Sequence, residues 1–536
     1  MGAVLAHLRS AAIIGIDAYP VEVEVHLASG LPSFATVGLP QGAVKEGRER
    51  VTAALASAGF SLPLKRITCN LAPADRPKTG SAFDLPIALG ILLASGQLPS
   101  GRLDGFLTVG ELGLEGDLRP VRGALSVALC ARALGCRGVV LPAGNAAEAA
   151  VVDGIETRSA STLADVCAFV SGAGELSLGG LTRAGCLPSM DLADFSDVRS
   201  QGAAKRALEV AAAGGHNVLM VGPPGTGKTM LARRLAGILP PMTLEEALET
   251  TRIHSVAGLL LPGGGVIPFR PFRAPHHTIS DAGLIGGGSW PRPGEVSLSH
   301  NGVLFLDELP EFRRNVLEVL RQPLEDGAVT LSRASMSVTF PSRFMLTAAM
   351  NPCPCGYRGD SLHECRCDDA SVERYLARIS GPLLDRIDIH LMVPAVSYAD
   401  LVAGAPGEPS ATVRARVEAA RARQGTRFRA LPAVRTNAQM TAREVRRWCR
   451  SDAGADSLLR EAVARLGLSA RAYHRVLKLA RTIADLAEAD EVASEHVAEA
   501  IQYRSLDRRG SRMPLRAPSE PSASFARPRA TMYPRT

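Results

Sequence analysis

Apolar and polar residues alternate along the first part of the chain in a way that predicts strands mixed with helices. Residues 21–25 alternate between valine and glutamate, which is typical of a half-buried strand. A second β-like pattern covers residues 34–37, and residues 43–57 have helical spacing. Further elements are expected at residues 67–71, 83–93, 107–110, 121–134 and 138–142. We therefore predict an α+β or α/β domain over residues 1–170.

The middle of the chain has the pattern of a second, larger α/β domain. Residues 171–190 are rich in Gly, Ser and Leu and have little periodicity, so we expect them to be a linker. After them, a helical segment at 203–213 precedes a buried strand at 216–221, a Gly-rich turn and a second helix. Apolar strands are expected again at 303–308 and 343–350. This order predicts a domain over residues 191–395.

The last third of the chain has helical spacing. Four segments with N-cap candidates predict helices at residues 410–424, 441–450, 455–466 and 469–487. We therefore expect a helical domain over residues 396–505. Residues 506–536 are rich in Arg, Pro and Ser, and we expect a disordered tail there.

Composition narrows the class of protein. The 536 residues are 46% hydrophobic and 21% charged, which is typical of globular domains. The net charge of +7 permits an anionic partner such as nucleic acid without requiring one. The start of the chain lacks a secretory layout, and its apolar runs are too short to cross a bilayer. We expect a cytoplasmic protein with no membrane partner.

A phosphate-binding motif follows the buried strand at 216–221. The pattern G-x-x-x-x-G-K-[ST] is matched by Gly222, Pro223, Pro224, Gly225, Thr226, Gly227, Lys228 and Thr229. The glycines let backbone N–H groups turn toward phosphate oxygens at a helix N-terminus. Lys228 supplies a positive charge to the β- and γ-phosphates, and Thr229 binds Mg²⁺. ATP and Mg²⁺ are therefore the expected cofactors.

Two further strand ends carry groups suited to hydrolysis. The strand at 303–308 ends in Asp307, which is suited to bind Mg²⁺, and Glu308, which is suited to polarise the attacking water. The strand at 343–350 ends in Asn351, whose neutral amide can help to position that water. An ordinary turn asparagine before Pro352 is the alternative for Asn351.

Four of the 10 cysteines crowd into one short segment. Cys353, Cys355, Cys365 and Cys367 form two C-x-C pairs, whereas the other cysteines are scattered singly. This is not the framework of a disulfide-rich secreted protein. Four thiolates can satisfy tetrahedral Zn²⁺, although structural zinc sites usually have wider spacing than C-x-C. Zinc, reduced thiols and a redox role are the three interpretations.

Six sequence blocks together resemble the AAA+ family of magnesium-chelatase-like proteins called YifB or ComM. The blocks are FDLPIALGIL, GPPGTGKT, RPFRAPHHT, GEVSLSHNGVLFLDELPEF, AAMNPCPCG and SGPLLDRID, and the resemblance reaches to about residue 506. It implies an α/β fold class with an N-terminal Lon-protease-like α+β domain, a central AAA+ P-loop domain with a parallel sheet, and a helical lid domain. It places a helix-2 insert, a pre-sensor hairpin and the Cys-rich loop within the central domain.

The same resemblance gives roles to two arginines. In such ATPases the Arg of an LLDR block reaches the γ-phosphate of a neighbouring subunit, which implies that Arg386 is an arginine finger acting in trans. A homohexameric ring is therefore expected. The alternative is a structural Arg386 paired with Asp385 or Asp388. Arg471 resembles the sensor arginine of the lid, which contacts nucleotide as the helical domain closes, and a helix-surface arginine is its alternative.

Two segments are candidates for contact with DNA. Residues 267–295 resemble the helix-2 insert, and Trp290 near its tip is suited to stack on bases or to pack under the loop. Residues 329–340 resemble the pre-sensor hairpin, with Arg333 near the tip and available to phosphate, or solvated on a surface hairpin. Adjacent His276 and His277 are expected to make structural hydrogen bonds rather than to bind a metal.

The first domain resembles the proteolytic domain of Lon and the similar domain of RadA. A Lon protease needs a Ser nucleophile activated by a Lys. Ser81 falls near the nucleophile position, but Leu125 stands in the block where Lon carries its Lys. We therefore expect a noncatalytic scaffold that helps rings to assemble or contacts DNA.

These features favour an ATP-driven DNA motor. By resemblance to ComM, we expect a hexamer that acts on single-stranded or branched DNA and drives branch migration during recombination of incoming DNA. Six arginines of the expected lid would add a phosphate-binding surface: Arg414, Arg416, Arg421, Arg423, Arg427 and Arg429. The alternatives are a magnesium-chelatase motor subunit, although the chain has no D-x-S-x-S motif, and an ATP-dependent protein remodeller.

Overall fold

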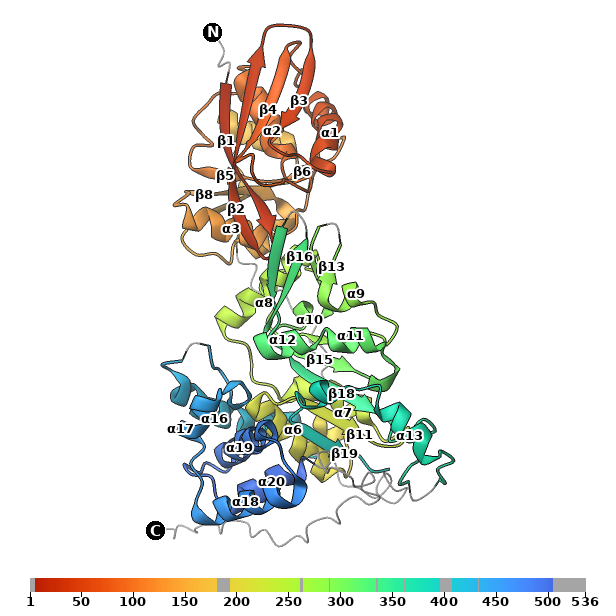
Figure 1. Cartoon of the computed structure of the whole chain (residues 1–536). Helices are drawn as coiled ribbons and strands as arrows, with labels where there is room; N and C mark the ends of the chain where they lie inside the picture. The colour runs from red at the N-terminus through yellow and green to blue at the C-terminus, as the bar shows by residue number, and fades with distance from the viewer. Residues whose placement is uncertain are drawn as a thin grey trace, which may run out of the picture.

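The computed structural model places two α/β regions and a helical region in one elongated molecule (Figure 1). It describes residues 5–180, 193–260, 264–288, 290–333, 336–360, 363–395, 407–431 and 433–504. The expected tail at 506–536 and the second half of the expected linker, residues 181–190, lie outside these residues. No described helix combines the length and apolar character that crossing a membrane requires.

The N-terminal region is built on an eight-stranded mixed sheet with the order β10-β9-β8-β5-β1-β2-β4-β3. Strands β1 and β2 form an antiparallel hairpin. Parallel pairing joins β1 with β5, β5 with β8, and β8 with β9. The strands of this sheet are β1 Leu5–Ile14, β2 Asp17–Ala28, β3 Ser33–Val37, β4 Arg66–Ala72, β5 Phe106–Thr108, β8 Gly138–Pro142, β9 Glu156–Ala160 and β10 Ser177–Leu178. Because β10 pairs with β9, the sheet continues into the segment expected as a linker.

Helices cover this sheet, and one of them is buried on nearly every side. Helix α2 carries apolar residues around its whole circumference, so it lies inside the N-terminal core rather than on its surface. The helices are α1 Ala43–Ser57, α2 Asp84–Ala94, α3 Ala124–Ala133, α4 Ala146–Ala149 and α5 Leu163–Ser171, and a small ladder pairs β6 Glu111–Leu112 with β7 Leu118–Arg119.

The central region holds a five-stranded sheet with the order β12-β15-β18-β11-β19, in which every pair is parallel. Its strands are β12 Phe272–Arg273, β15 Val303–Leu306, β18 Met345–Met350, β11 Val218–Val221 and β19 Ile389–Met392. Strand β11 is a continuous apolar run because both faces of a parallel sheet are covered. Val218 and Met220 enter one hydrophobic cluster, and Leu219 and Val221 enter another on the opposite face.

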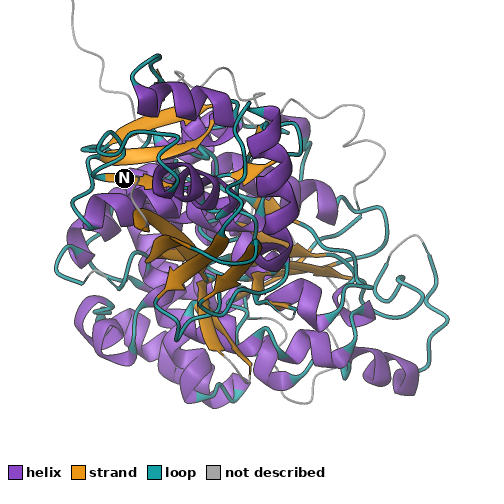
Figure 2. Cartoon of the chain, turned by 90° about the horizontal axis from the view of Figure 1, so that it is seen from above, coloured by secondary structure: helices purple, strands orange, loops and turns teal. Residues whose placement is uncertain are grey.

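Short helices and two hairpins complete the central region. The helices are α6 Gly202–Gly214, α7 Lys228–Ile238, α8 Leu244–Ala257, α9 Asp281–Ile285, α10 Glu295–Leu298, α11 Arg314–Glu318, α12 Arg321–Asp326, α13 Asp369–Leu376 and α14 Gly381–Leu384. The hairpins pair β13 Gly286–Gly287 with β14 Arg292–Pro293, and β16 Ala328–Arg333 with β17 Met336–Pro341. Seen from above, the helices surround the strands (Figure 2).

The C-terminal region is helical and shares a core with the central sheet. Its helices are α16 Ser410–Phe428, α17 Ala442–Trp448, α18 Ala453–Leu466, α19 Ala470–Leu486 and α20 Ser494–Gln502. Helix α16 packs against α6 and α7, and one hydrophobic cluster runs from β11 through α6 into α19. The helical region is therefore fixed to the P-loop side of the sheet by buried apolar contact.

Helix α8 joins the N-terminal region to the central one. Arg252 donates to the Ile16 carbonyl oxygen at 3.1 Å and pairs with Asp17 in the β1–β2 turn. Ser255 Oγ donates to the buried Glu148 carboxylate at 2.6 Å. Ile16 itself belongs to the hydrophobic cluster of the central region. The contact between the two regions therefore combines apolar burial with buried polar pairs.

Candidate nucleotide site

The P-loop joins β11 to α7 and has the backbone that phosphate binding needs. Gly225 and Gly227 have φ values of 77° and 82°, in the left-handed region where glycine is favoured. A Cβ atom on Gly222 would lie 2.2 Å from the Val393 carbonyl oxygen, so only glycine fits the start of the loop. Helix α7 begins at Lys228, which directs its first N–H groups toward the loop.

Lys228 and Asn351 lie together because their strands are neighbours. Strand β11 pairs with β18, so the loop after Val221 lies beside the end of β18 at Met350. Lys228 Nζ donates to the carbonyl oxygens of Gly222 and Pro223 at 2.7 and 2.8 Å, and to Asn351 Oδ1 at 3.3 Å. Burial lowers the pKa of Lys228, while Asp307 acts in the opposite direction. The ammonium group is therefore held where phosphate oxygens would replace its carbonyl partners.

Thr229 and Asp307 form the second contact across the site. Thr229 Oγ1 donates to Asp307 Oδ2 at 2.7 Å, although 78 residues separate them in the chain. Strand β15 places Asp307 at the same edge of the parallel sheet as the P-loop. A hydroxyl and a carboxylate in contact are the ligand pair that a P-loop protein offers to Mg²⁺. The residues present therefore fit an Mg²⁺–nucleotide complex.

Glu308 faces a partner that the sequence interpretation missed. Its backbone is left-handed, with φ 52°, and its side chain is 57% exposed. Glu308 Oε2 lies 3.4 Å from His277 Nδ1, and the two residues follow the adjacent strands β15 and β12. The expectation of a structural hydrogen bond suits His276, whose Nδ1 lies 2.9 Å from Thr278 Oγ1. The parallel order of β12 and β15 is the signal that would have linked His277 to Glu308.

Arg386 lies in a cavity distinct from the P-loop. It follows α14, and its side chain is 8% exposed. Its guanidinium donates to the Pro382 carbonyl oxygen at 2.6 Å and pairs with Glu325 of α12. Its acidic partner is thus Glu325, not Asp385 or Asp388. The cavity has a volume of about 640 Å³, and no residue of the fully described P-loop lines it.

Arg471 lines this same cavity. It lies in the first turn of α19, which begins after the N-cap Ser469, and it is exposed. Arg343, two residues before β18, also lines the cavity, as does Arg475, which pairs with Asp388 at 2.7 Å. Although burial raises the pKa of Asp388, Arg475 and His216 hold it below its ordinary value overall. Arg386 and Arg471 are therefore brought together, and neither faces the P-loop of its own chain.

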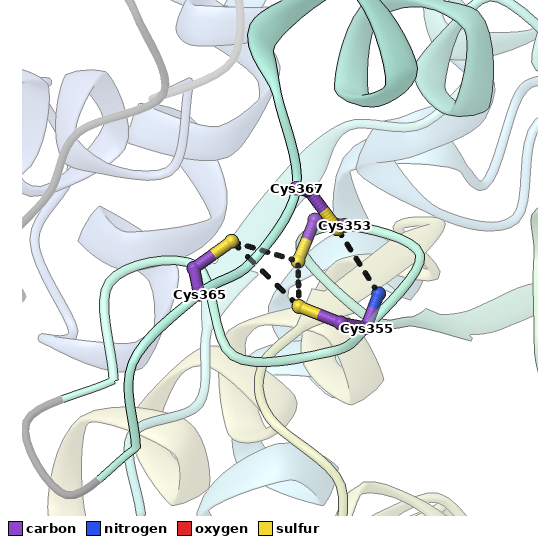
Figure 3. A group of neighbouring side chains, drawn as sticks. All are labelled: Cys353, Cys355, Cys365 and Cys367. Atoms are coloured by element: carbon purple, nitrogen blue, oxygen red, sulfur yellow. Dashed lines mark hydrogen bonds between the residues drawn. The ribbon is translucent and has the colours of Figure 1, made fainter.

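The four clustered cysteines lie next to the P-loop (Figure 3). Their four Sγ atoms lie within 4.8 Å of one another. Cys353 is buried and the other three are half-buried. A Cβ atom on Gly356 would lie 2.7 Å from Pro224 Cδ, so this segment packs directly on the phosphate loop.

The two candidates for contact with DNA lie on neighbouring hairpins. Arg333 ends β16 and is exposed, whereas Trp290 lies in the β13–β14 turn and is half-buried. A Cβ atom on Gly287 of β13 would lie 3.7 Å from an Nη atom of Arg333, and one on Gly286 would lie 3.2 Å from Leu331 of β16. The structure therefore brings the β13–β14 and β16–β17 hairpins side by side.

The expected basic surface of the lid is corrected by the structure, because most of its arginines are used internally. Arg414 donates to Gly237, Arg421 to the Ala212 carbonyl oxygen at 2.8 Å, and Arg427 pairs with Asp485. Arg416 pairs with Glu209 and Glu408, and Arg423 pairs with Asp490. Helical periodicity could not reveal these partners. Arg414, Arg416 and Arg421 fix α16 to α6 and α7. The partners of Arg423 and Arg427 lie after and within α19, respectively. Only Arg429 of the six lacks such a contact among the described residues.

In the N-terminal region, the residues at the Lon-like positions do not form a nucleophile and base. Ser81 Oγ hydrogen-bonds Glu111, and Leu125 is fully buried in α3. Lys78 is also buried, and its ammonium group donates to the Pro73 carbonyl oxygen. Burial raises the pKa of the nearby Asp84 to about 6, against the opposing effect of its partner Arg50.

Comparison with known proteins assigns the chain to a class. Residues 194–401 match the family described as magnesium chelatase, subunit ChlI, and residues 407–504 match the C-terminal part of that subunit. Residues 23–145 match a further family described as subunit ChlI of Mg-chelatase. With the P-loop site described above, these matches define a magnesium-chelatase-like AAA ATPase.

Similarity over nearly the full chain is more specific. The YifB protein of Salmonella typhimurium is 46% identical over 514 residues, which is 95% of this chain and 98% of the relative. The competence protein ComM of Haemophilus influenzae is 47% identical over 508 residues, covering 94% of this chain and 98% of ComM. The chain belongs to the YifB/ComM family. By contrast, the magnesium-chelatase 67 kDa subunit of Chlorobaculum parvum is 29% identical over only 30% of this chain.

Proposed function

We propose that this protein is a homohexameric AAA+ motor that hydrolyses ATP to remodel single-stranded or branched DNA. The observation that carries the proposal is the separation of the two halves of the catalytic machinery. At the P-loop, Thr229 contacts Asp307 and Lys228 contacts Asn351, whereas Arg386 lies in another cavity. A ring that sets the Arg386 cavity against the next subunit's P-loop would complete each site.

Each residue has a defined task in this proposal. The P-loop backbone and Lys228 bind the β- and γ-phosphates, Thr229 and Asp307 hold Mg²⁺, and Glu308 polarises the attacking water with help from Asn351. Bound Mg²⁺ would neutralise charge that develops on the phosphates. Arg386 would approach the γ-phosphate of a neighbour, and Arg471, which lines the same cavity, would contact nucleotide as the helical domain closes.

In this proposal the domains follow the boundaries expected from the sequence. Residues 1–170 form a noncatalytic Lon-protease-like domain, 191–395 the AAA+ core and 396–505 the lid, and β10 extends the first domain into the segment expected as a linker. The buried Leu125 at the position of the Lon lysine supports the noncatalytic role. The contacts of α8 with Ile16 in the β1–β2 turn and with Glu148 of α4 support a scaffold that is fixed to the core.

DNA as the partner is supported by one exposed basic hairpin rather than by the lid. Arg333 is exposed beside the β13–β14 turn that carries Trp290, so a phosphate contact and a stacking surface are adjacent. The relative ComM is named a competence protein, which favours branch migration during integration of incoming DNA.

The test is steady-state ATP hydrolysis without nucleic acid, with single strands and with a four-way junction, using Glu308→Gln as the inactive control. Stimulation by the junction, together with binding of forked DNA at about 50 mM salt, is the expected result. Robust hydrolysis that is indifferent to every DNA would refute DNA as the partner. It would favour the alternatives, a magnesium-chelatase-type motor subunit or an ATP-dependent protein remodeller.

A further inference from the structure

The sulfur atoms of the cysteine cluster have the spacing of a tetrahedral metal site. The Sγ of Cys353 lies 3.4 Å from that of Cys355 and 3.7 Å from that of Cys365, and the Sγ atoms of Cys355 and Cys365 are 3.7 Å apart. Zinc–sulfur bonds of about 2.3 Å in a regular tetrahedron give sulfur–sulfur edges of about 3.8 Å. A disulfide needs about 2.05 Å. The distances among these three sulfurs therefore fit separate thiolates around one ion, and the Sγ of Cys367 lies within 4.8 Å of all three.

A backbone donor also faces the cluster. The backbone N–H of Cys355 donates to the Cys367 Sγ at 3.4 Å, which places a donor where a thiolate carries its charge. Figure 3 shows the sulfur atoms of Cys353, Cys355 and Cys365 turned toward one another from two separate arms of the chain, with Cys367 beside them. Four sulfur ligands and no described histidine or carboxylate in the group favour Zn²⁺ over harder cations.

The position of the cluster relates it to the nucleotide site. Its first cysteine lies two residues after Asn351, which accepts from Lys228, and its Gly356 packs on Pro224 of the P-loop. Its last cysteine directly precedes Asp368, the N-cap of α13. Burial raises the pKa of Tyr375 in α13 to about 12 overall, although the backbone of Asn351 lowers that pKa. The two arms therefore close a loop that begins and ends beside Asn351.

We propose that Cys353, Cys355, Cys365 and Cys367 bind one Zn²⁺ ion, and that this ion holds Asn351 and the P-loop in register. Zinc binding is inferred from the geometry of the cluster alone. The role of the ion in positioning Asn351 and the P-loop rests on the proposed ATPase function. The four cysteines are structural ligands, and Asn351 is the residue that they position. Without the ion, the C-x-C arms lose the link that closes the loop beside the phosphates.

The first experiment measures the metal and needs no variant. The full chain is purified without chelators, its zinc content is measured by mass spectrometry, and its zinc absorption edge is used to determine the ligands. We expect about one zinc ion per chain with four sulfur neighbours at about 2.3 Å. Less than about a quarter of an equivalent, or a shell dominated by nitrogen and oxygen, would overturn metal binding.

Variants assign the ligands. Cys365→Ser with Cys367→Ser should reduce bound zinc to below about a quarter of an equivalent. The matched control is Cys130→Ser in α3 of the N-terminal region, which should leave zinc content unchanged. Circular dichroism shows whether the double variant folds. Unchanged zinc in a folded double variant would refute the assignment.

The positioning role is tested by removing the ion from wild-type protein with a chelator. We expect backbone hydrogen exchange to rise in residues 351–356 and 222–229 while exchange in the N-terminal sheet is unchanged, and ATP hydrolysis to fall and to return when zinc is restored. Zinc loss that leaves exchange in both segments unchanged would refute the positioning role whatever the ATPase activity. Exchange that responds to zinc in a protein without any ATPase activity would instead refute the proposed function.

Discussion

The P-loop edge of the central sheet and the Arg386 cavity differ in how complete they are within one chain. At the P-loop edge, the charged and polar groups already contact one another. Thr229 contacts Asp307, and Lys228 contacts Asn351. In the cavity, Arg386 is occupied by Glu325, and Arg471 is exposed. One region needs only Mg²⁺ and nucleotide, whereas the other holds these two arginines in a cavity that no residue of the fully described P-loop lines. We infer that the second region works on a neighbouring subunit.

The largest expected effect comes from Arg386→Ala. Because a trans-acting arginine stabilises charge in the transition state, hydrolysis should fall by about 10³-fold or more while nucleotide binding is retained. The measurement pairs steady-state hydrolysis with binding of a fluorescent ATP analogue.

Mixing subunits separates a trans role from a structural one. Rings mixed from Arg386→Ala and Glu308→Gln chains contain interfaces in which an intact P-loop faces an intact arginine. Hydrolysis should therefore reappear on mixing two inactive variants. If mixed rings form and hydrolysis stays absent, Arg386 does not act on a neighbouring subunit.

Arg471→Ala should have a smaller effect, of about 10- to 100-fold on hydrolysis, because one charge-assisted hydrogen bond to phosphate is lost. The matched control is Arg465→Ala, which removes an exposed i,i+4 partner of Glu461 on α18. Equal activity of the two variants would leave Arg471 without a nucleotide role.

His277→Ala tests whether the contact with Glu308 restrains hydrolysis. Since the imidazole holds the Glu308 carboxylate on the β12 side, its loss should raise hydrolysis without DNA by about 2- to 10-fold, the value of one hydrogen bond. His276→Ala should change the rate less, because the Nδ1 of His276 lies in contact with Thr278 instead. A lower rate in His277→Ala would show that the contact assists Glu308 rather than restrains it.

The smallest effect concerns DNA. Arg333→Ala should weaken binding of forked DNA uniformly across sequences and reduce the slope of log affinity against log salt by about one. Arg423→Ala is the control, because Arg423 already pairs with Asp490 in the helical region. A reduced slope in Arg423→Ala but not in Arg333→Ala would show that DNA contacts the helical region rather than the β16–β17 hairpin.

The sequence predicted most elements but not how their side chains pair. Helix α1 and strand β8 have the bounds that periodicity predicts, because an amphipathic helix and a buried apolar strand are local patterns. Helices α8 and α20 were not predicted. The arginines of α16 showed only a basic composition in the sequence, and the structure pairs them with α6, α7 and the later helices.

The sequence by itself determined the phosphate loop, the acidic strand end and the cysteine pairs, because each is a short motif whose chemistry is local. Only the tertiary structure decided that Asp307 contacts Thr229, that His277 contacts Glu308 and that Arg386 lies with Arg471 away from the P-loop. Parallel strands joined by helical crossovers bring residues far apart in the chain to one sheet edge, so the order of strands sets these contacts. This dependence is clearest for arginines, because the acid that pairs with an arginine is the one that folding brings close to it.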